Sequence, residues 1–187
     1  MAIALLVAMT ISLRNFFWAL TIFLCASAGT AAAGQLDLVV NGRSYHVNSD
    51  YDWNENNYGL GLEYQFDSSS RWLWSVNANA FMDSRENMSY MAGGGLKRRL
   101  FQSERAAGYY FDVGLNAFVM SRADFNDHAP FPGILPTLSF GMRNVGVNLA
   151  YIPETVVRDI AQAKVLDPNV GGVFFLQFKF RLPSQSQ

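Results

Sequence analysis

Apolar and polar residues alternate along most of the chain after residue 33. From Tyr58 to Phe66 every second residue is Tyr, Leu or Phe, and the residues between them are Gly, Glu and Gln. A period of two is typical of β-strands, whose successive side chains point to opposite faces. On this pattern we predict eight strands, at residues 36–47, 58–66, 72–80, 90–101, 111–117, 136–143, 145–151 and 174–181.

Several of these segments have about ten residues, the length at which a tilted strand crosses a bilayer. Aromatic residues gather near the strand ends, as in the interfacial girdles of membrane barrels. They are Tyr45, Tyr58, Phe66, Trp72, Tyr90, Phe101, Tyr109, Tyr151 and Phe180. Short polar connections also alternate with mostly longer ones. These features predict an all-β fold, an eight-stranded antiparallel up-and-down transmembrane β-barrel.

A soluble barrel of the lipocalin kind is the alternative, because it also has eight alternating strands. Its interior would be apolar and its exterior polar. Here the face rich in Trp, Phe, Leu and Val is the more continuous one, and the opposite face carries polar residues such as Glu63, Asn77 and Asp112. Lipid requires an apolar exterior with closed sheet edges, so the pattern favours the membrane barrel.

The first 33 residues have the pattern of an export signal. The apolar run Phe16–Ala28 follows Arg14, and three alanines ending at Ala33 form a small-residue cleavage site. We expect cleavage after Ala33, which leaves residues 34–187 as a barrel domain with a short polar tail, Leu182–Gln187. An uncleaved membrane helix is the alternative.

The composition of the chain limits the classes of partner and of covalent cross-link that we expect. The 187 residues include 14 Lys and Arg against 15 Asp and Glu, a balance that argues against nucleic acid as a partner. Cys25, the only cysteine, falls in the expected signal, so we predict no disulfide in the mature chain. Met1 and Met9 are both open as the first residue.

Residues capable of nucleophilic chemistry fall at one rim of the predicted barrel. His46 ends the first strand, and Asp83 and Ser84 end the third; these two strands run in the same direction, so their ends meet at the rim with the longer loops. A serine hydroxyl needs a neighbouring base, and a third group often orients that base. We predict Ser84 as nucleophile or proton-relaying hydroxyl, His46 as general base and Asp83 as orienting acid.

From about Asp37 to Phe180 the chain resembles the lipid A palmitoyltransferases of the Gram-negative outer membrane, the PagP family. The first of the similar segments ends in the family's catalytic His, and the third carries its Asp and Ser. The segments are Asp37–His46, Asn54-Glu55 with Gly59–Gly61, and Ala80–Ser84. The resemblance therefore implies that His46, Asp83 and Ser84 are the catalytic residues.

The resemblance also implies a hydrocarbon pocket in the barrel. Gly95 matches the glycine at the floor of that pocket, with Met82 and Met91 expected on its walls together with Phe118 and Met120. Arg122 matches a residue of an outer loop. Three prolines match strand gaps where lipid enters sideways: Pro132, Pro136 and Pro153.

The activity implied by the resemblance is transfer of a fatty acyl chain, expected to be palmitoyl, from a phospholipid donor to a hydroxyl of lipid A. It implies neither a metal nor a diffusible cofactor. We expect the protein to reach the outer membrane of a Gram-negative bacterium through the signal peptide, the periplasm and the barrel-assembly machinery. Two alternatives stay open: a deacylase of lipid A or phospholipid on the same barrel, and a non-catalytic outer-membrane barrel.

Overall fold

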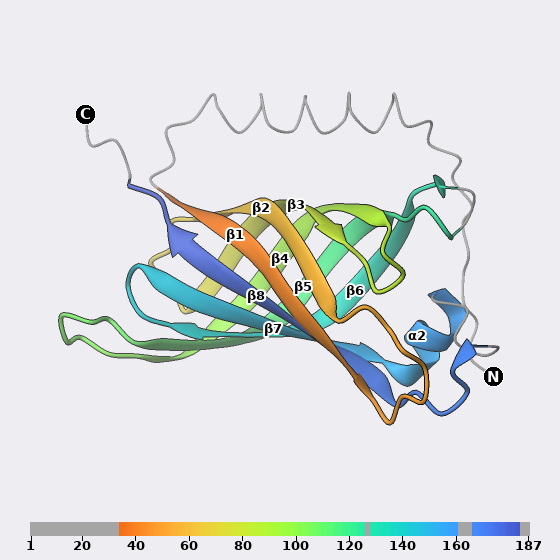
Figure 1. Cartoon of the computed structure of the whole chain (residues 1–187). Helices are drawn as coiled ribbons and strands as arrows, with labels where there is room; N and C mark the ends of the chain where they lie inside the picture. Colours follow the sequence, from red (N-terminus) through yellow and green to blue (C-terminus); the bar gives the residue numbers. More distant parts are fainter. Residues whose placement is uncertain (1–33, 126–127, 161–165, 184–187) are drawn as a thin grey trace, which may run out of the picture.

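The computed structural model describes residues 34–125, 128–160 and 166–183. Its elements are β1 (Gly34–Val47), β2 (Asn56–Phe66), β3 (Trp72–Met82), β4 (Met88–Gln102), β5 (Tyr110–Ser121), β6 (Phe131–Gly141), β7 (Val145–Pro153), α2 (Glu154–Ile160) and β8 (Gly172–Arg181). Each strand pairs antiparallel with the next, and β8 pairs with β1, so the sheet closes into a barrel (Figure 1). The predicted fold class is confirmed. The predicted signal, residues 1–33, and residues 184–187 of the tail lie outside the described residues.

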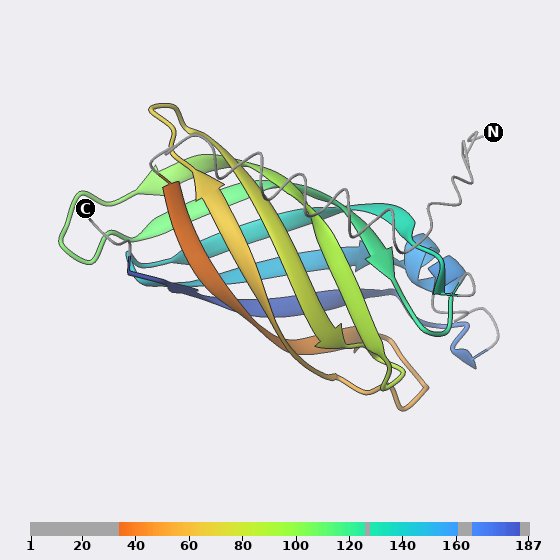
Figure 2. The same cartoon turned by 90° about the horizontal axis from the view of Figure 1, so that it is seen from above.

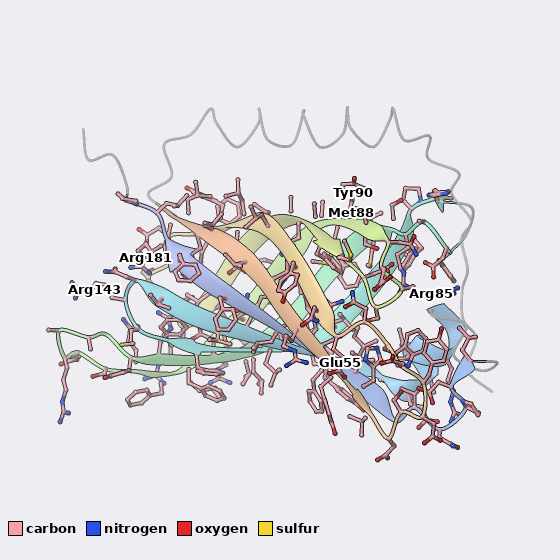
Figure 3. The ribbon with its side chains drawn as sticks, in the orientation of Figure 1. Glu55, Arg85, Met88, Tyr90, Arg143 and Arg181 are labelled. Atoms are coloured by element: carbon pink, nitrogen blue, oxygen red, sulfur yellow. The ribbon has the colours of Figure 1, made fainter. Side chains whose placement is uncertain are left out.

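The two faces of the barrel wall differ in polarity. Leu60 and Trp74 point outward and are 60% and 59% exposed, whereas Glu63 and Ser75 on the same strands point inward and are 4% and 5% exposed. Met88 and Tyr90 likewise stand on the outer surface in Figure 3. An apolar exterior around a polar interior is the pattern of a membrane barrel and the reverse of a lipocalin.

β6 begins at Phe131, whereas the alternation predicted a start at Pro136. It pairs with β5 along its whole length, but β7 pairs with β6 only from Thr137 to Gly141. A proline has no N–H to donate, so it fits a strand that lacks a partner on one side. Pro132 and Pro136 therefore belong to the stretch of β6 that has no partner on its β7 side.

α2 was not predicted, because the connection after β7 was expected to be a loop. The helix follows Pro153 directly; Glu154 lies in its first turn and Arg158 in its last, and their side chains form an ion pair of 2.8 Å. This placement of charge agrees with the helix dipole and with the spacing of side chains on one helix face. Among the described residues, the helical part of the structure holds no segment with the length and hydropathy of a membrane span.

The ends of β1, β3, β5 and β7 meet at one rim, which also carries α2 (Figures 1 and 2). We call it the α2 rim. Figure 3 shows Glu55 and Arg85 at this rim and Arg143 and Arg181 at the opposite one. The strand directions thus bring His46, Asp83 and Ser84 to the same end of the molecule, as the sequence predicted.

Candidate active site

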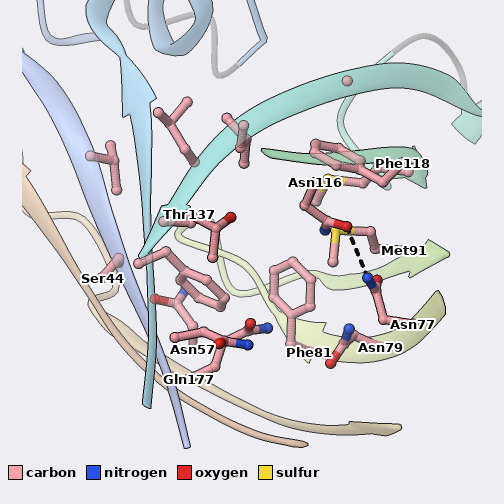
Figure 4. A pocket seen from close by; sticks show the side chains of 18 of the residues that line it. Ser44, Asn57, Asn77, Asn79, Phe81, Met91, Asn116, Phe118, Thr137 and Gln177 are labelled. Carbon is pink, nitrogen blue, oxygen red and sulfur yellow. Dashed lines mark hydrogen bonds between the residues drawn. The ribbon is translucent and has the colours of Figure 1, made fainter. Parts of the chain in front are cut away.

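A cavity of about 320 Å³ runs inside the barrel from the α2 rim down to the buried Glu63 and Lys97. This volume lies in the range of small-molecule sites. Phe81, Met91 and Phe118 point into it, and Asn77 donates a hydrogen bond of 2.9 Å to Asn116 across its side (Figure 4). His46, Asp83 and Ser84 all line the cavity at its rim end.

Of the residues expected on the pocket walls, Met91, Phe118 and Met120 line this cavity and Met82 does not. Along β3 the outward residues share the parity of Trp72 and Trp74, and Met82 has that parity. Its neighbour Phe81 faces the cavity instead and is buried. The prediction for Met82 was wrong because it followed motif position and ignored the alternation of the strand.

Gly95 lies on an inward-facing position of β4. A Cβ atom at this position would come within 2.7 Å of Ser75 Oγ and 3.7 Å of Asn116 Oδ1, and both of these residues line the cavity. The next inward residue on β4 is Lys97. A larger side chain at position 95 would therefore occupy the lower part of the cavity.

A buried ionic cluster closes the barrel below the cavity. Lys97 and Lys179 each donate to Glu63 Oε1 at 3.0 Å, and Lys179 also lies 3.3 Å from Asp37. All four side chains are at most 6% exposed. Buried charges are stable in pairs of this kind. The cluster separates the cavity from a polar hollow at the opposite rim, which Arg143 and other charged residues line.

His46 is held at the end of β1, with its side chain 4% exposed. Its backbone N–H donates to Glu55 Oε1 at 3.2 Å, and the same oxygen lies 3.7 Å from His46 Nδ1. Arg43 lies 3.5 Å from the other oxygen of Glu55. Glu55 is thus the carboxylate beside the imidazole.

Asp83 occupies a different environment from the one predicted. One carboxylate oxygen accepts from the backbone N–H groups of Arg85 and Asn87 at 2.9 and 3.0 Å; the other accepts from Ser89 Oγ at 3.1 Å and lies 3.2 Å from Arg122. Within the described residues, no contact joins Asp83 to the imidazole of His46. Its carboxylate instead fixes the tight β3–β4 turn that presents Ser84.

The dipeptide Asn54-Glu55 contacts both His46 and the Asp83-Ser84 pair. While Glu55 contacts His46, the Asn54 backbone N–H donates to the Ser84 carbonyl at 3.1 Å, and the Asn54 side chain donates to the Asp83 carbonyl at 3.2 Å. The connection between β1 and β2 thereby places the histidine and the Asp-Ser pair relative to each other. In the sequence this dipeptide stands out only through its resemblance to the PagP family.

Arg122 lies in the connection between β5 and β6, and its side chain is buried there. Besides Asp83 it contacts Asp124 at 3.3 Å, and Asp124 in turn contacts Arg85 at 3.0 Å. These ion pairs attach the end of β5 to the β3–β4 turn. Arg122 also lines the cavity.

The cavity reaches the barrel wall between β6 and β7. Four consecutive residues, Pro132–Leu135, line it, although neighbours in a strand point to opposite faces. These residues belong to the part of β6 that β7 leaves unpaired. Pro132 lies at this opening, Pro136 at its lower end, and Pro153 ends β7 opposite Gly172 of β8.

Sequence reasoning missed two residues beside His46. The indole ring of Trp53 stacks on the imidazole, with ring centroids 5.2 Å apart, and Asp167 accepts from Trp53 Nε1 at 2.9 Å. Trp53 directly precedes Asn54-Glu55, a segment that resembles the family, and this position could have marked it as a residue near the site. Asp167 follows α2, and nothing in the local pattern distinguishes it from a solvated loop carboxylate.

The family model that describes the "antimicrobial peptide resistance and lipid A acylation protein PagP" matches residues 28–178. A protein of Methylobacillus flagellatus named lipid A acyltransferase PagP is 32% identical over 127 residues, which cover 64% of this chain and 67% of the relative. The protein of that name from Bordetella pertussis is also 32% identical, over 64% of this chain and 68% of its own. The protein of that name from Laribacter hongkongensis is 30% identical over 66% of this chain and 61% of its own length. With the closed barrel and the rim geometry, these matches show that the chain belongs to the PagP family of lipid A acylation proteins.

Proposed function

We propose that this protein is a lipid A acyltransferase that takes an acyl chain from a phospholipid and transfers it to a hydroxyl of lipid A. The observation that carries the proposal is that His46, Asp83 and Ser84 all line the mouth of a cavity with Phe and Met on its walls. A family of lipid A acylation proteins supplies the substrate class.

In the proposed mechanism the donor chain fills the cavity, and its ester lies at the α2 rim. His46 removes a proton from the attacking hydroxyl, either directly or through Ser84, and the oxygen attacks the ester carbonyl. The bond to the glycerol oxygen then breaks, and His46 returns the proton to that oxygen. The products are acylated lipid A and a lysophospholipid.

The roles of the two carboxylates follow from their contacts. Glu55, 3.7 Å from His46 Nδ1, stabilises the imidazolium that forms when His46 accepts the proton. Asp83 holds the turn that presents Ser84 and binds Arg122. Asp83 therefore acts on the serine side of the site, while the histidine side depends on Glu55.

Lipid reaches the cavity sideways in this proposal. From Phe131 to Pro136, β6 pairs with β5 but not with β7. This gap opens the wall next to Ile152 and to Val156 of α2. These residues are apolar, so an acyl chain can pass them without crossing a polar surface. Gly95 lies toward the far end of the path and limits the chain length; a palmitoyl chain is the proposed fit.

The test is mass spectrometry of lipid A from cells that express the wild-type chain or Ser84→Ala at equal outer-membrane levels. We expect a gain of one acyl mass with the wild-type chain and none with Ser84→Ala. Ser68→Ala is the matched control, because Ser68 lies in the β2–β3 turn at the opposite rim; it should keep the gain.

Loss of acyl mass from lipid A, or release of free fatty acid, would instead identify a deacylase. Unchanged lipid A with a correctly folded wild-type barrel, even after a chelator has disturbed the outer leaflet, would overturn the proposal in favour of a non-catalytic barrel.

A further inference from the structure

The connection between β7 and β8 is attached to the connection between β1 and β2 through one buried carboxylate. Asp167 is 0% exposed, and its oxygens accept from Ser49 Oγ at 2.5 Å, Trp53 Nε1 at 2.9 Å and the Asp50 N–H at 3.3 Å. All three donors lie in the β1–β2 connection. A carboxylate is buried at large cost unless such donors surround it.

The charge of Asp167 is stable in this position. Burial by itself raises the pKa of the carboxyl, but the hydrogen bonds from Ser49, Trp53 and the Asp50 N–H hold its pKa below the usual range. The group is therefore ionised at neutral pH. An ionised acceptor forms stronger hydrogen bonds than a neutral one, which favours a fixed indole N–H.

Trp53, which donates to Asp167, also packs against His46. Its indole is 6% exposed, is packed against Val157, Val170 and Val173, and lies nearly parallel to the imidazole, with 11° between the ring planes. Because the rings are stacked, the plane of the indole determines the plane that the imidazole can adopt. The hydrogen bond to Asp167 fixes the indole about its own axis.

The imidazole needs such support. Glu55 lies beside its Nδ1, but at 3.7 Å this contact is too long for a good hydrogen bond, and within the described residues Nδ1 has no hydrogen-bond partner. A catalytic base works only when its ring is held in the reactive orientation. The ring stack therefore contributes an orientation that the Glu55 contact alone does not provide.

We propose that Trp53 and Asp167 are positioning residues for His46, so that a segment between α2 and β8 takes part in catalysis without touching the substrate. The proposal rests on the acyl transfer by His46 described above. It predicts that Trp53 and Asp167 act as one unit through the hydrogen bond that joins them, while the negative charge of Asp167 also favours the protonated form of His46 directly.

A double-mutant cycle tests the unit. Trp53→Phe keeps a ring over His46 but removes the N–H, and Asp167→Ala removes the acceptor. Each change should lower kcat roughly tenfold while KM for the phospholipid donor stays within about twofold, and the double variant should be no slower than the slower single one. Asp167→Asn, which keeps a side-chain acceptor, should recover part of the loss.

Asn169→Ala is the matched control. Asn169 ties the same two connections together through a hydrogen bond of 2.7 Å to Asp50, but this bond does not involve the rings. If the connection acts only as a structural anchor, Asn169→Ala should lower kcat as much as Trp53→Phe does. Additive losses from Trp53 and Asp167, losses confined to KM, or unchanged kcat in folded variants would overturn the proposal.

A second measurement does not depend on activity. The sequence has two histidines, so a His128→Gln background leaves His46 as the single histidine that diethyl pyrocarbonate can modify, and the N-carbethoxyhistidine it forms is followed by its own absorbance. We expect Asp167→Ala to raise the rate of His46 modification several-fold in folded, detergent-solubilised barrels, and Asn169→Ala to leave it unchanged. If the wild-type chain transfers no acyl group, the proposed function fails; equal modification rates would overturn the positioning role separately.

Discussion

At the scale of single residues, the missing side chain at Gly95 leaves space in the lumen just above the ionic cluster of Glu63, Lys97 and Lys179. Sequence similarity alone assigned a depth-limiting role to this glycine. The structure adds the geometry, because a side chain there would extend between Ser75 and Asn116. The neighbouring Gly94 points to the outside of the barrel, where a Cβ atom meets only the Ser75 carbonyl oxygen at 3.3 Å.

Gly95→Met should therefore shift the donor preference toward acyl chains that are shorter by several carbons, because the new side chain occupies the far end of the cavity. Competition between phospholipids of different acyl length, read out by mass spectrometry of the product, measures the shift. Gly94→Met makes the same chemical change on the lipid-facing side and should leave selectivity as in the wild-type chain. Identical selectivity in both variants would show that Gly95 does not limit the length of the acyl chain.

Residue identities could be predicted better than residue partners. His46, Asp83 and Ser84 were expected at one rim, because the first and third strands of an up-and-down barrel run in the same direction. The expected contact of Asp83 with His46 was replaced by contacts with Arg122 and with the β3–β4 turn, while Glu55 lies beside the imidazole. Side-chain partners at the rim depend on how the loops fold over it, and the alternation along the strands carries no information about loop conformation.

At the scale of elements, the proposed lipid entry depends on the separation of β6 from β7. The two strands pair only from Thr137 to Gly141, and above this ladder the cavity reaches the wall. The prolines in the sequence indicated interrupted strands. They could not indicate which neighbouring strand would be the unpaired one.

A disulfide across the opening should block lipid entry. In the double variant Leu135→Cys/Ile152→Cys, the two thiols lie on the open stretches of β6 and β7; oxidation should abolish transfer, and a reductant should restore it. Leu138→Cys/Leu149→Cys is the control, because these residues are already partners in the ladder and do not line the cavity. Transfer at an unchanged rate with the first pair fully oxidised, as judged by non-reducing electrophoresis, would show that the donor enters elsewhere.

At the scale of the whole molecule, the barrel has an apolar exterior and a polar, ion-paired interior. Outward residues such as Leu115, 51% exposed, face the lipid, and inward ones such as Ser139, 0% exposed, are shielded from it. A charge on the lipid-facing surface costs most at the bilayer midplane and least near the interfaces. This gradient provides a direct test of the membrane orientation.

Leu115→Arg, in the middle of β5, should lower the free energy of unfolding by about 2–4 kcal/mol, and Tyr109→Arg, just before β5 begins, by about 0–1 kcal/mol. Urea unfolding in lipid vesicles, followed by tryptophan fluorescence, measures both. Equal costs at the two positions would contradict the placement of the bilayer around the strands.

The sequence by itself determined the number of strands, the closure of the barrel, the face of each strand that meets lipid, and the rim that His46, Asp83 and Ser84 share. All of these follow from a period of two and from strand direction, which are local properties of the chain. Only the tertiary structure decided that β7 separates from β6, that α2 lies beside the opening, and that Asp167 meets Trp53. These contacts join segments far apart in sequence, and they depend on the way in which the closed barrel brings its loops together.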